Sequence, residues 1–290
     1  MEIGIIYAIT CSIIWGTMFA LSKNVKASQI FQNIWITFGG FLIASTVFFS
    51  LGIAIDQLTF IAGLIAGSFW AIAALSLLYS MKYIGIGRSL PLSVSGQIIV
   101  SFLWGILFFG EIIPSGLTNI IIASTAIVLV CISAFLVGKT KENSDVKNFK
   151  IGFVFAIMSS VFWGTQFVPV KFFSADPFAV MFPFSIGMLA TALLIAVVKF
   201  GKNINFSYSG KFRNLLNGFM WAAGNYLVLI AIASIGLAKG YVLSQIGVVI
   251  IPPLLGIFYF KEIIKRKNHI MLFLATIIII IGTWLTSLVK

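Results

Sequence analysis

Residues 3–23, IGIIYAITCSIIWGTMFALSK, return as residues 151–171, IGFVFAIMSSVFWGTQFVPVK, with ten identities in 21 positions. A second pair of segments, 67–111 and 218–262, shares 15 of 45 positions. Trp, Gly and Glu recur in the same order in both pairs, which a biased composition does not produce by chance. The repeat indicates an internal duplication of the whole chain.

The composition places the chain in a lipid bilayer. Of its 290 residues 60% are hydrophobic and 9% are charged, and the mean hydropathy is +1.13. A soluble domain carries roughly 25% charged residues, so lipid must be the outer solvent here. Ten apolar runs approach the roughly 20 residues that a spanning helix needs. The predicted spans are 3–22, 31–54, 59–81, 87–109, 113–137, 151–170, 178–198, 212–232, 238–260 and 269–289.

The spans divide into two five-helix repeats, residues 1–137 and 151–290, joined by a polar linker over 138–150. Because five is odd, the second repeat must cross the membrane upside down relative to the first. We therefore predict an all-α integral membrane protein built from two inverted repeats. This is the architecture of many secondary transporters, in which two inverted halves can expose one central site to either side.

The basic residues predict the orientation. Sixteen of the 19 Lys and Arg residues fall in loops on one side of the predicted membrane, and Lys171, Lys239 and Lys290 fall on the other. Basic loops stay in the cytoplasm. We therefore expect a multi-pass protein of the cell membrane with a cytoplasmic linker and both termini outside the cytoplasm.

Three motifs carry a resemblance to a known family. Trp15-Gly16-Thr17 returns as Trp163-Gly164-Thr165, the fourth span closes on Phe109-Gly110-Glu111, and residues 85–93, GIGRSLPLS, run on to Gly96-Gln97. The five-plus-five pattern resembles the drug/metabolite transporter superfamily, and the stretch around Arg88 resembles its glucose/ribose porter family of bacterial sugar uptake proteins. The resemblance implies sugar uptake, linked to protons, through a cavity lined by the first, third and fourth helices of each half.

Tryptophans, amides and small hydroxyls near the middle of the spans are the candidate substrate-binding residues. An indole can stack on the apolar face of a sugar and donate a hydrogen bond. Residues shared by both halves should serve the scaffold, whereas a sugar lacks two-fold symmetry and can be held by amides that do not repeat. Packing in the core, or hydrogen bonds between helices, is the alternative role for each residue. The candidates are Trp15, Thr17, Trp70, Ser93, Gln97, Trp163, Thr165, Gln166, Trp221, Asn225, Tyr226, Ser244 and Gln245.

Charged residues are confined to the span ends. None of the seven acids lies at mid-span, which favours a neutral solute and leaves Glu111, Asp176 and Glu262 as the candidates for proton coupling. Arg88 and Lys239 begin equivalent helices. They are interpreted either as interfacial anchors or, with Glu111 and Glu262, as gates on the two sides.

These features favour a secondary transporter that moves a monosaccharide, glucose-like or ribose-like, by alternating access. The alternative is an exporter of an amino acid or related metabolite with the same fold. A membrane enzyme or receptor would not need the duplication. We expect a small neutral polar solute and the lipid bilayer as partners, and no nucleic acid. No cofactor is expected, and no metal site, because His269 is the only histidine. The full phosphate-binding motif Gly-x-x-x-x-Gly-Lys-Ser/Thr, which would let ATP drive transport, is absent from the sequence.

Overall fold

The computed structural model describes residues 2–109, 116–140, 146–201, 203, 206–235 and 237–286, and its regular elements are all helical. Each predicted span overlaps a long helix, with ends that shift by a few residues, and the span 151–170 also overlaps a second, short helix. The helices are α1 (Glu2–Met18, continued by the 3-10 helix Phe19–Ser22), α2 (Gln29–Leu51), α3 (Gln57–Ile84), α4 (Ile86–Leu107), α5 (Gly116–Lys139), α6 (Val146–Thr165), α7 (Val168–Phe172), α8 (Met181–Phe200), α9 (Lys211–Ile235), α10 (Leu237–Leu254, continued by the π-helical turn Leu255–Tyr259) and α11 (Arg266–Thr286).

Prolines interrupt two of the predicted spans. Pro169 is the second residue of the short α7, where a missing backbone donor costs nothing, so the chain turns between α6 and α7. Pro252 and Pro253 lie inside α10 and remove two backbone donors, and the helix widens into the π-helical turn that follows them. Both breaks lie in the second half, so the two halves differ locally.

Helix ends are set by local chemistry. Asp56 caps α3, since its Oδ1 accepts hydrogen bonds from the backbone amides of Leu58 (2.9 Å) and Thr59 (3.0 Å). Ser28 caps α2 by accepting from the amide of Ile30 at 3.3 Å. Gly85, with φ +80°, separates α3 from α4 by a single residue. That sharp junction places the start of α4 directly beside the end of α3.

The outer surface is that of a membrane protein. In the described part of the chain, eight helices are long and apolar enough to cross a bilayer. Large apolar side chains such as Ile6, Phe49 and Val198 are exposed on their outer faces, which is stable only where lipid replaces water. The protein is therefore a multi-pass membrane protein.

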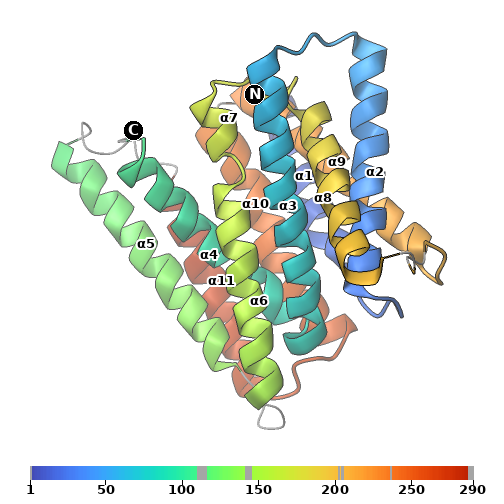
Figure 1. The fold of residues 1–290 in the computed structure, drawn as a ribbon. Coiled ribbons are helices and arrows are strands. Elements are labelled where there is room, and N and C mark those ends of the chain that lie inside the picture. The colour runs from blue at the N-terminus through green and yellow to red at the C-terminus, as the bar shows by residue number, and fades with distance from the viewer. Residues whose placement is uncertain are drawn as a thin grey trace.

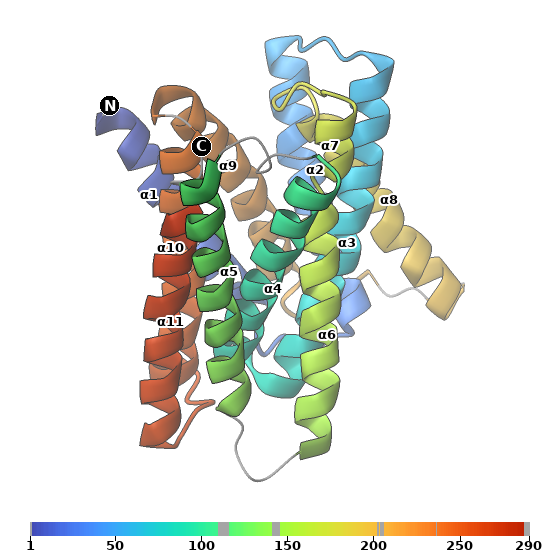
Figure 2. The same cartoon turned by 90° about the vertical axis from the view of Figure 1, so that its left-hand side faces the viewer.

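The helices pack in corresponding pairs from the two halves. α1 lies against α9 and α10, and α6 lies against α3 and α4. α2 contacts α9, and α8 contacts α3. α5 and α11 run side by side along one edge of the molecule (Figure 2). α1 begins and α11 ends at the upper end of the molecule in Figure 1, whereas the turns from α1 to α2 and from α3 to α4 lie at the lower end.

Glycines bring these helix pairs into backbone contact. A Cβ on Gly67 of α3 would collide with the Phe184 carbonyl oxygen of α8, and a Cβ on Gly218 of α9 would collide with the Ile36 carbonyl oxygen of α2. Small residues allow such close approach in lipid, where dispersion rather than hydrophobicity holds helices together. Each of these two contacts joins a helix of one half to a helix of the other half.

Candidate functional site

A cavity of about 330 Å³ occupies the centre of the molecule. Its lower wall is formed by Phe19 at the end of α1 and Leu90 in the second turn of α4. Its upper wall includes Val170, Pro177 and Ile232, which belong to segments at the same end as the start of α1. The cavity therefore extends from the centre toward that end. At about 30 Å³ for each water molecule, it has room for roughly ten waters, the size class of a small solute.

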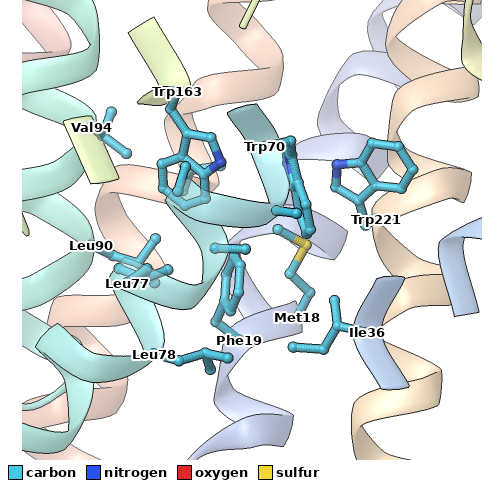
Figure 3. Packing of buried hydrophobic residues seen from close by; sticks show 14 of the residues in the cluster. Met18, Phe19, Ile36, Trp70, Leu77, Leu78, Leu90, Val94, Trp163 and Trp221 are labelled. Atoms are coloured by element: carbon cyan, nitrogen blue, oxygen red, sulfur yellow. The ribbon is translucent and has the colours of Figure 1, made fainter. Parts of the chain in front are cut away.

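Aromatic rings form the middle of the wall (Figure 3). The rings of Trp70 and Trp221 are 5.1 Å apart between centroids and inclined by 55°. Phe184 adds a ring 5.4 Å from that of Trp221, and Phe19 lies 6.0 Å from Trp163. These residues come from α1, α3, α6, α8 and α9, so both halves contribute flat apolar surface to the same chamber.

Four amide side chains line the cavity: Gln97, Gln166, Asn225 and Gln245. The Asn225 Nδ2 donates to the Trp221 carbonyl oxygen at 2.8 Å, which holds the amide against its own helix. The Gln166 Oε1 is buried and accepts no hydrogen bond in the structure, and the Trp163 Nε1 donates none. Buried polar groups without partners are uncommon and unfavourable. A donor and an acceptor without partners therefore lie three residues apart at the end of α6, and both atoms have almost no accessible surface.

No acidic or basic residue is found among the described residues that line the cavity. Asp176 is exposed, and its Oδ1 accepts from the amides of Phe178 and Ala179 at 2.8 and 2.6 Å. Glu262 forms an ion pair with Lys23 below the cavity. The chamber thus offers apolar faces and neutral hydrogen-bonding groups.

The cavity wall includes eight of the predicted substrate-binding residues: Trp15, Trp70, Gln97, Trp163, Gln166, Trp221, Asn225 and Gln245. The other five lie elsewhere: Thr17, Ser93, Thr165, Tyr226 and Ser244.

The hydroxyls outside the wall bond to helix backbone. Thr17 donates to the Ile13 carbonyl oxygen at 2.8 Å and Thr165 to that of Val161 at 2.8 Å, each within its own helix. Because short hydroxyl side chains reach their own helix backbone easily, their spacing did not indicate the side they face.

Polar side chains spaced four residues apart along α4, at positions 89, 93, 97 and 101, divide between the cavity and neighbouring helices. Ser89 accepts from Ser80 of α3 at 2.9 Å, Ser93 donates to the Ala156 carbonyl oxygen of α6 at 3.4 Å, and Ser101 donates to the Gly164 carbonyl oxygen at 3.1 Å. Gln97 lines the cavity. The serines therefore have the alternative role that the sequence left open, which is hydrogen bonding between helices.

Two further candidates are held away from the wall. Ser244 is completely buried in α10. Tyr226 packs its ring 5.2 Å from that of Phe178.

Two of the four predicted gating residues, Arg88 and Glu262, have described side chains, and each bonds to a residue that the sequence did not indicate. Arg88 is buried and donates from Nη2 to the Thr140 carbonyl oxygen at 2.8 Å and from Nε to its hydroxyl at 3.2 Å, so it holds the end of α5 against α4. Glu262 pairs with Lys23. Glu111 and the side chain of Lys239 lie outside the described residues. An ion pair between distant helices depends on how those helices pack. The spacing of residues in the sequence therefore did not reveal that Lys23 is the partner of Glu262.

Sequence reasoning also missed the apolar part of the wall, which includes Met18, Phe19, Leu90, Val94 and Phe184. Apolar residues in a membrane helix can face lipid, a neighbouring helix or a cavity. The only available signal was their position one or two turns from the polar candidates, and that signal is shared by many other residues.

Comparison with known proteins agrees with this architecture. The family model described as "Sugar transport protein" matches residues 6–289. The chain is 25% identical to the glucose uptake protein GlcU of Bacillus subtilis strain 168, covering 99% of this chain and 98% of that one. It is 27% identical to a relative in Priestia megaterium, whose name describes it as a probable glucose uptake protein, covering 99% of both chains.

One solved crystal structure has the same fold as the chain, with a TM-score of 0.64 at 15% sequence identity and 99% of both chains covered. The family match covers nearly the whole length, including all the helices that form the cavity. The chain belongs to the sugar transport protein family.

Proposed function

We propose that this protein transports a monosaccharide across the cell membrane by alternating access, and that the central cavity is the substrate site. The observation that carries the proposal is the chemistry of the cavity wall, where indole faces alternate with amides and no described charge is present. A monosaccharide has apolar C–H faces and a rim of hydroxyls, and the wall supplies a partner for each. The names of the relatives point to glucose as the first candidate.

Hydrogen-bond exchange explains how this wall could select a sugar. A sugar loses its water hydrogen bonds on entering the cavity, and the loss must be offset by protein groups. The Trp163 Nε1 and Gln166 Oε1 have no partner, and a side-chain movement that opens them to the cavity would supply one donor and one acceptor. The solute would therefore relieve a cost already present in the empty chamber. An apolar solute of the same size would leave both groups unpaired.

Export of an amino acid by the same fold is the second candidate function. An amino acid carries an ammonium and a carboxylate, and each needs an opposite charge or a dense set of hydrogen bonds when it leaves water. The described wall has no such charge. The sugar is therefore the better match.

The proposed mechanism rests on the inverted duplication. Its support is the pairing of α1 with α9 and α10, which is matched by that of α6 with α3 and α4. Gly67 and Gly218 are equivalent in the sequence repeat, and each approaches a backbone carbonyl of the opposite half. Two halves with matched contacts can exchange conformations, and that exchange would open the cavity to the other end.

We propose that the cavity faces the exterior in this conformation. Its upper wall lies at the end where α1 begins, and the basic turns after α1, α3 and α8 lie at the opposite end. The positive-inside rule makes the basic end cytoplasmic. Both termini, in this orientation, are extracytoplasmic.

Uptake into proteoliposomes tests the function. We expect labelled glucose or ribose to enter with saturable kinetics and to be displaced by the unlabelled sugar, while labelled neutral amino acids remain outside. Running the same vesicles with and without an imposed pH gradient tests the proton linkage that the family resemblance implies. Saturable flux of an amino acid without sugar flux would overturn the sugar assignment.

A further inference from the structure

Lys23 and Glu262 form an ion pair between the two halves of the protein, below the central cavity. Lys23 follows the 3-10 helix that ends the first span, and Glu262 follows the π-helical turn that ends α10. Their side chains are 16% and 13% exposed. The pair is thus largely removed from solvent, where a charge without its partner would be unfavourable.

Both partners make additional contacts with the neighbouring helix ends. The Lys23 Nζ donates to the Met81 carbonyl oxygen in the last turn of α3 at 3.2 Å. The Glu262 carboxylate lies 3.5 Å from the Gly87 amide in the first turn of α4. The pair therefore joins the ends of α1 and α10 to the junction between α3 and α4.

The backbone around Glu262 is shaped to admit its carboxylate. A Cβ on Gly85 would collide with Glu262 Oε2, and Gly85 has a φ of +80°, which disfavours any side chain there. A Cβ on Gly87 would lie 3.2 Å from the Cα of Gly256, so α4 and the π-helical turn touch at this level. The Glu262 carboxylate therefore occupies space left by Gly85, where the two halves cross closely.

The pair lies on the path between the cavity and the lower end of the molecule. Phe19 and Leu90 line the cavity floor, and Lys23 and Gly87 are about one turn below them on the same segments. In Figure 3 Phe19, Leu77, Leu78 and Leu90 lie below the tryptophan rings. The floor is thus an apolar layer with the ion pair beneath it.

We propose that the Lys23–Glu262 ion pair is the gate that keeps this end of the transport path closed while the cavity faces the other end. The proposal rests on the alternating-access function given above and assigns residues to one of its steps. For the solute to leave through the lower end, α1 and α10 must separate from the junction of α3 and α4. That separation breaks the pair and exposes both charges to water, where each is hydrated.

The ion pair thus stabilises one of the two conformations selectively. A contact that is present in only one of two conformations shifts the equilibrium between them by the free energy of that contact. In the sequence repeat Lys23 corresponds to Lys171, and Glu262 corresponds to Glu111. Since Glu111 lies outside the described residues, the proposal rests on Lys23 and Glu262 alone.

Labelling of a cysteine in the cavity floor from each membrane face tests the gate. Leu90→Cys is introduced into the Cys131→Ala background, and vesicles of both orientations are treated with a membrane-impermeant thiol reagent. In the parent the reagent should react slowly from the side of the α1–α2 turn. Glu262→Gln and Lys23→Met should each speed that reaction roughly tenfold or more, a shift of about 1.4 kcal/mol or larger.

The matched control is Lys26→Met, which removes a neighbouring exposed positive charge and leaves the pair intact. It should label like the parent. Lys23→Arg keeps the positive charge opposite Glu262 and should label slowly, as the parent does. If either neutral variant fails to fold, the other variant still reports on the gate.

Unchanged labelling in the neutral variants, or equal acceleration by Lys26→Met, would overturn the proposal. The labelling needs no sugar, so it is independent of the substrate. A protein that shows the gate but transports no sugar would contradict the proposed function, whereas sugar uptake with no change in labelling would contradict the gate.

Discussion

Trp70 and Trp221 occupy equivalent positions in the two halves, and their rings meet at the centre of the protein with centroids 5.1 Å apart. Two equivalent residues can touch each other only near the axis that relates their halves. The pair therefore lies where a two-fold axis of an inverted duplication would pass. Both rings line the cavity, so a solute there would contact both halves at once.

Trp163→Phe should weaken sugar binding while the protein remains folded. The substitution keeps an aromatic ring in the wall and removes the Nε1 donor, which has no partner in the structure. Loss of one hydrogen bond to a ligand costs about 1–3 kcal/mol, or roughly tenfold to a hundredfold in Kd. Titration of purified protein with glucose by calorimetry measures the change.

The control for this prediction is Trp104→Phe. The Trp104 Nε1 donates to the Thr165 hydroxyl at 3.0 Å, and neither residue lines the cavity. This variant should bind glucose like the parent and lose some thermal stability. If Trp163→Phe bound glucose as tightly as the parent, the indole N–H of Trp163 would not be a substrate contact.

Asn225→Ala and Gln97→Ala should weaken binding by the same about 1–3 kcal/mol, with nearly normal expression. Both amides line the cavity, whereas Asn217, two turns before Asn225 on the same helix, donates to the Ser22 hydroxyl at 2.8 Å outside it. Asn217→Ala should therefore lower the thermal midpoint without changing the glucose Kd. If both cavity variants bind glucose like the parent, these amides hold helices together.

Gly67→Ala and Gly218→Ala should destabilise the protein to a similar extent. Each added methyl group would collide with a backbone carbonyl of the opposite half, and overpacking of this kind typically costs about 1–3 kcal/mol. Ser68→Ala is the control, because its hydroxyl bonds to the Leu64 carbonyl oxygen of its own helix. Thermal unfolding in a mild detergent gives the comparison, and tolerance of one glycine variant but not the other would contradict the matched packing.

The cap at Asp56 should make stability depend on pH. Hydrogen bonds from Thr59, the hydroxyl first and the amide second, hold the pKa of Asp56 below its ordinary value. A lowered folded pKa means that the stabilisation is present above the pKa of the unfolded carboxyl, about 3.9, and is lost as the pH falls through the lower folded value. Asp56→Asn keeps a capping oxygen without a titrating charge. Its thermal midpoint should fall less than that of the parent on acidification, and parallel curves would argue against this role.

A reporter fused after Lys290 should be extracytoplasmic, and one inserted in the 138–150 linker should be cytoplasmic. The basis is the excess of basic residues in the loops on the linker side. Two reporter enzymes, one active only outside the cytoplasm and one active only inside it, are each fused at both positions, and their activities locate the two positions. A cytoplasmic terminal reporter would invert the orientation and would make the Lys23–Glu262 end the exterior one.

The sequence by itself determined that the protein is helical, that it crosses the membrane many times, and approximately where each helix begins and ends. In lipid a helix must satisfy its own backbone groups, so length and hydropathy suffice to define it. The repeated Trp15 and Trp163 motifs and the amides at Gln97 and Asn225 also pointed to the residues that meet in the cavity.

Only the tertiary structure decided which side of each helix faces the cavity and which charges meet. Gln97 and Ser93 lie one turn apart on α4, yet Gln97 lines the chamber while Ser93 bonds to the backbone of α6. Glu262 pairs with Lys23, more than 200 positions away in the chain, and Arg88 bonds to Thr140. Helical periodicity defines a face, but the partner of that face depends on how distant helices rotate and cross, and those choices are settled by close packing among all of them.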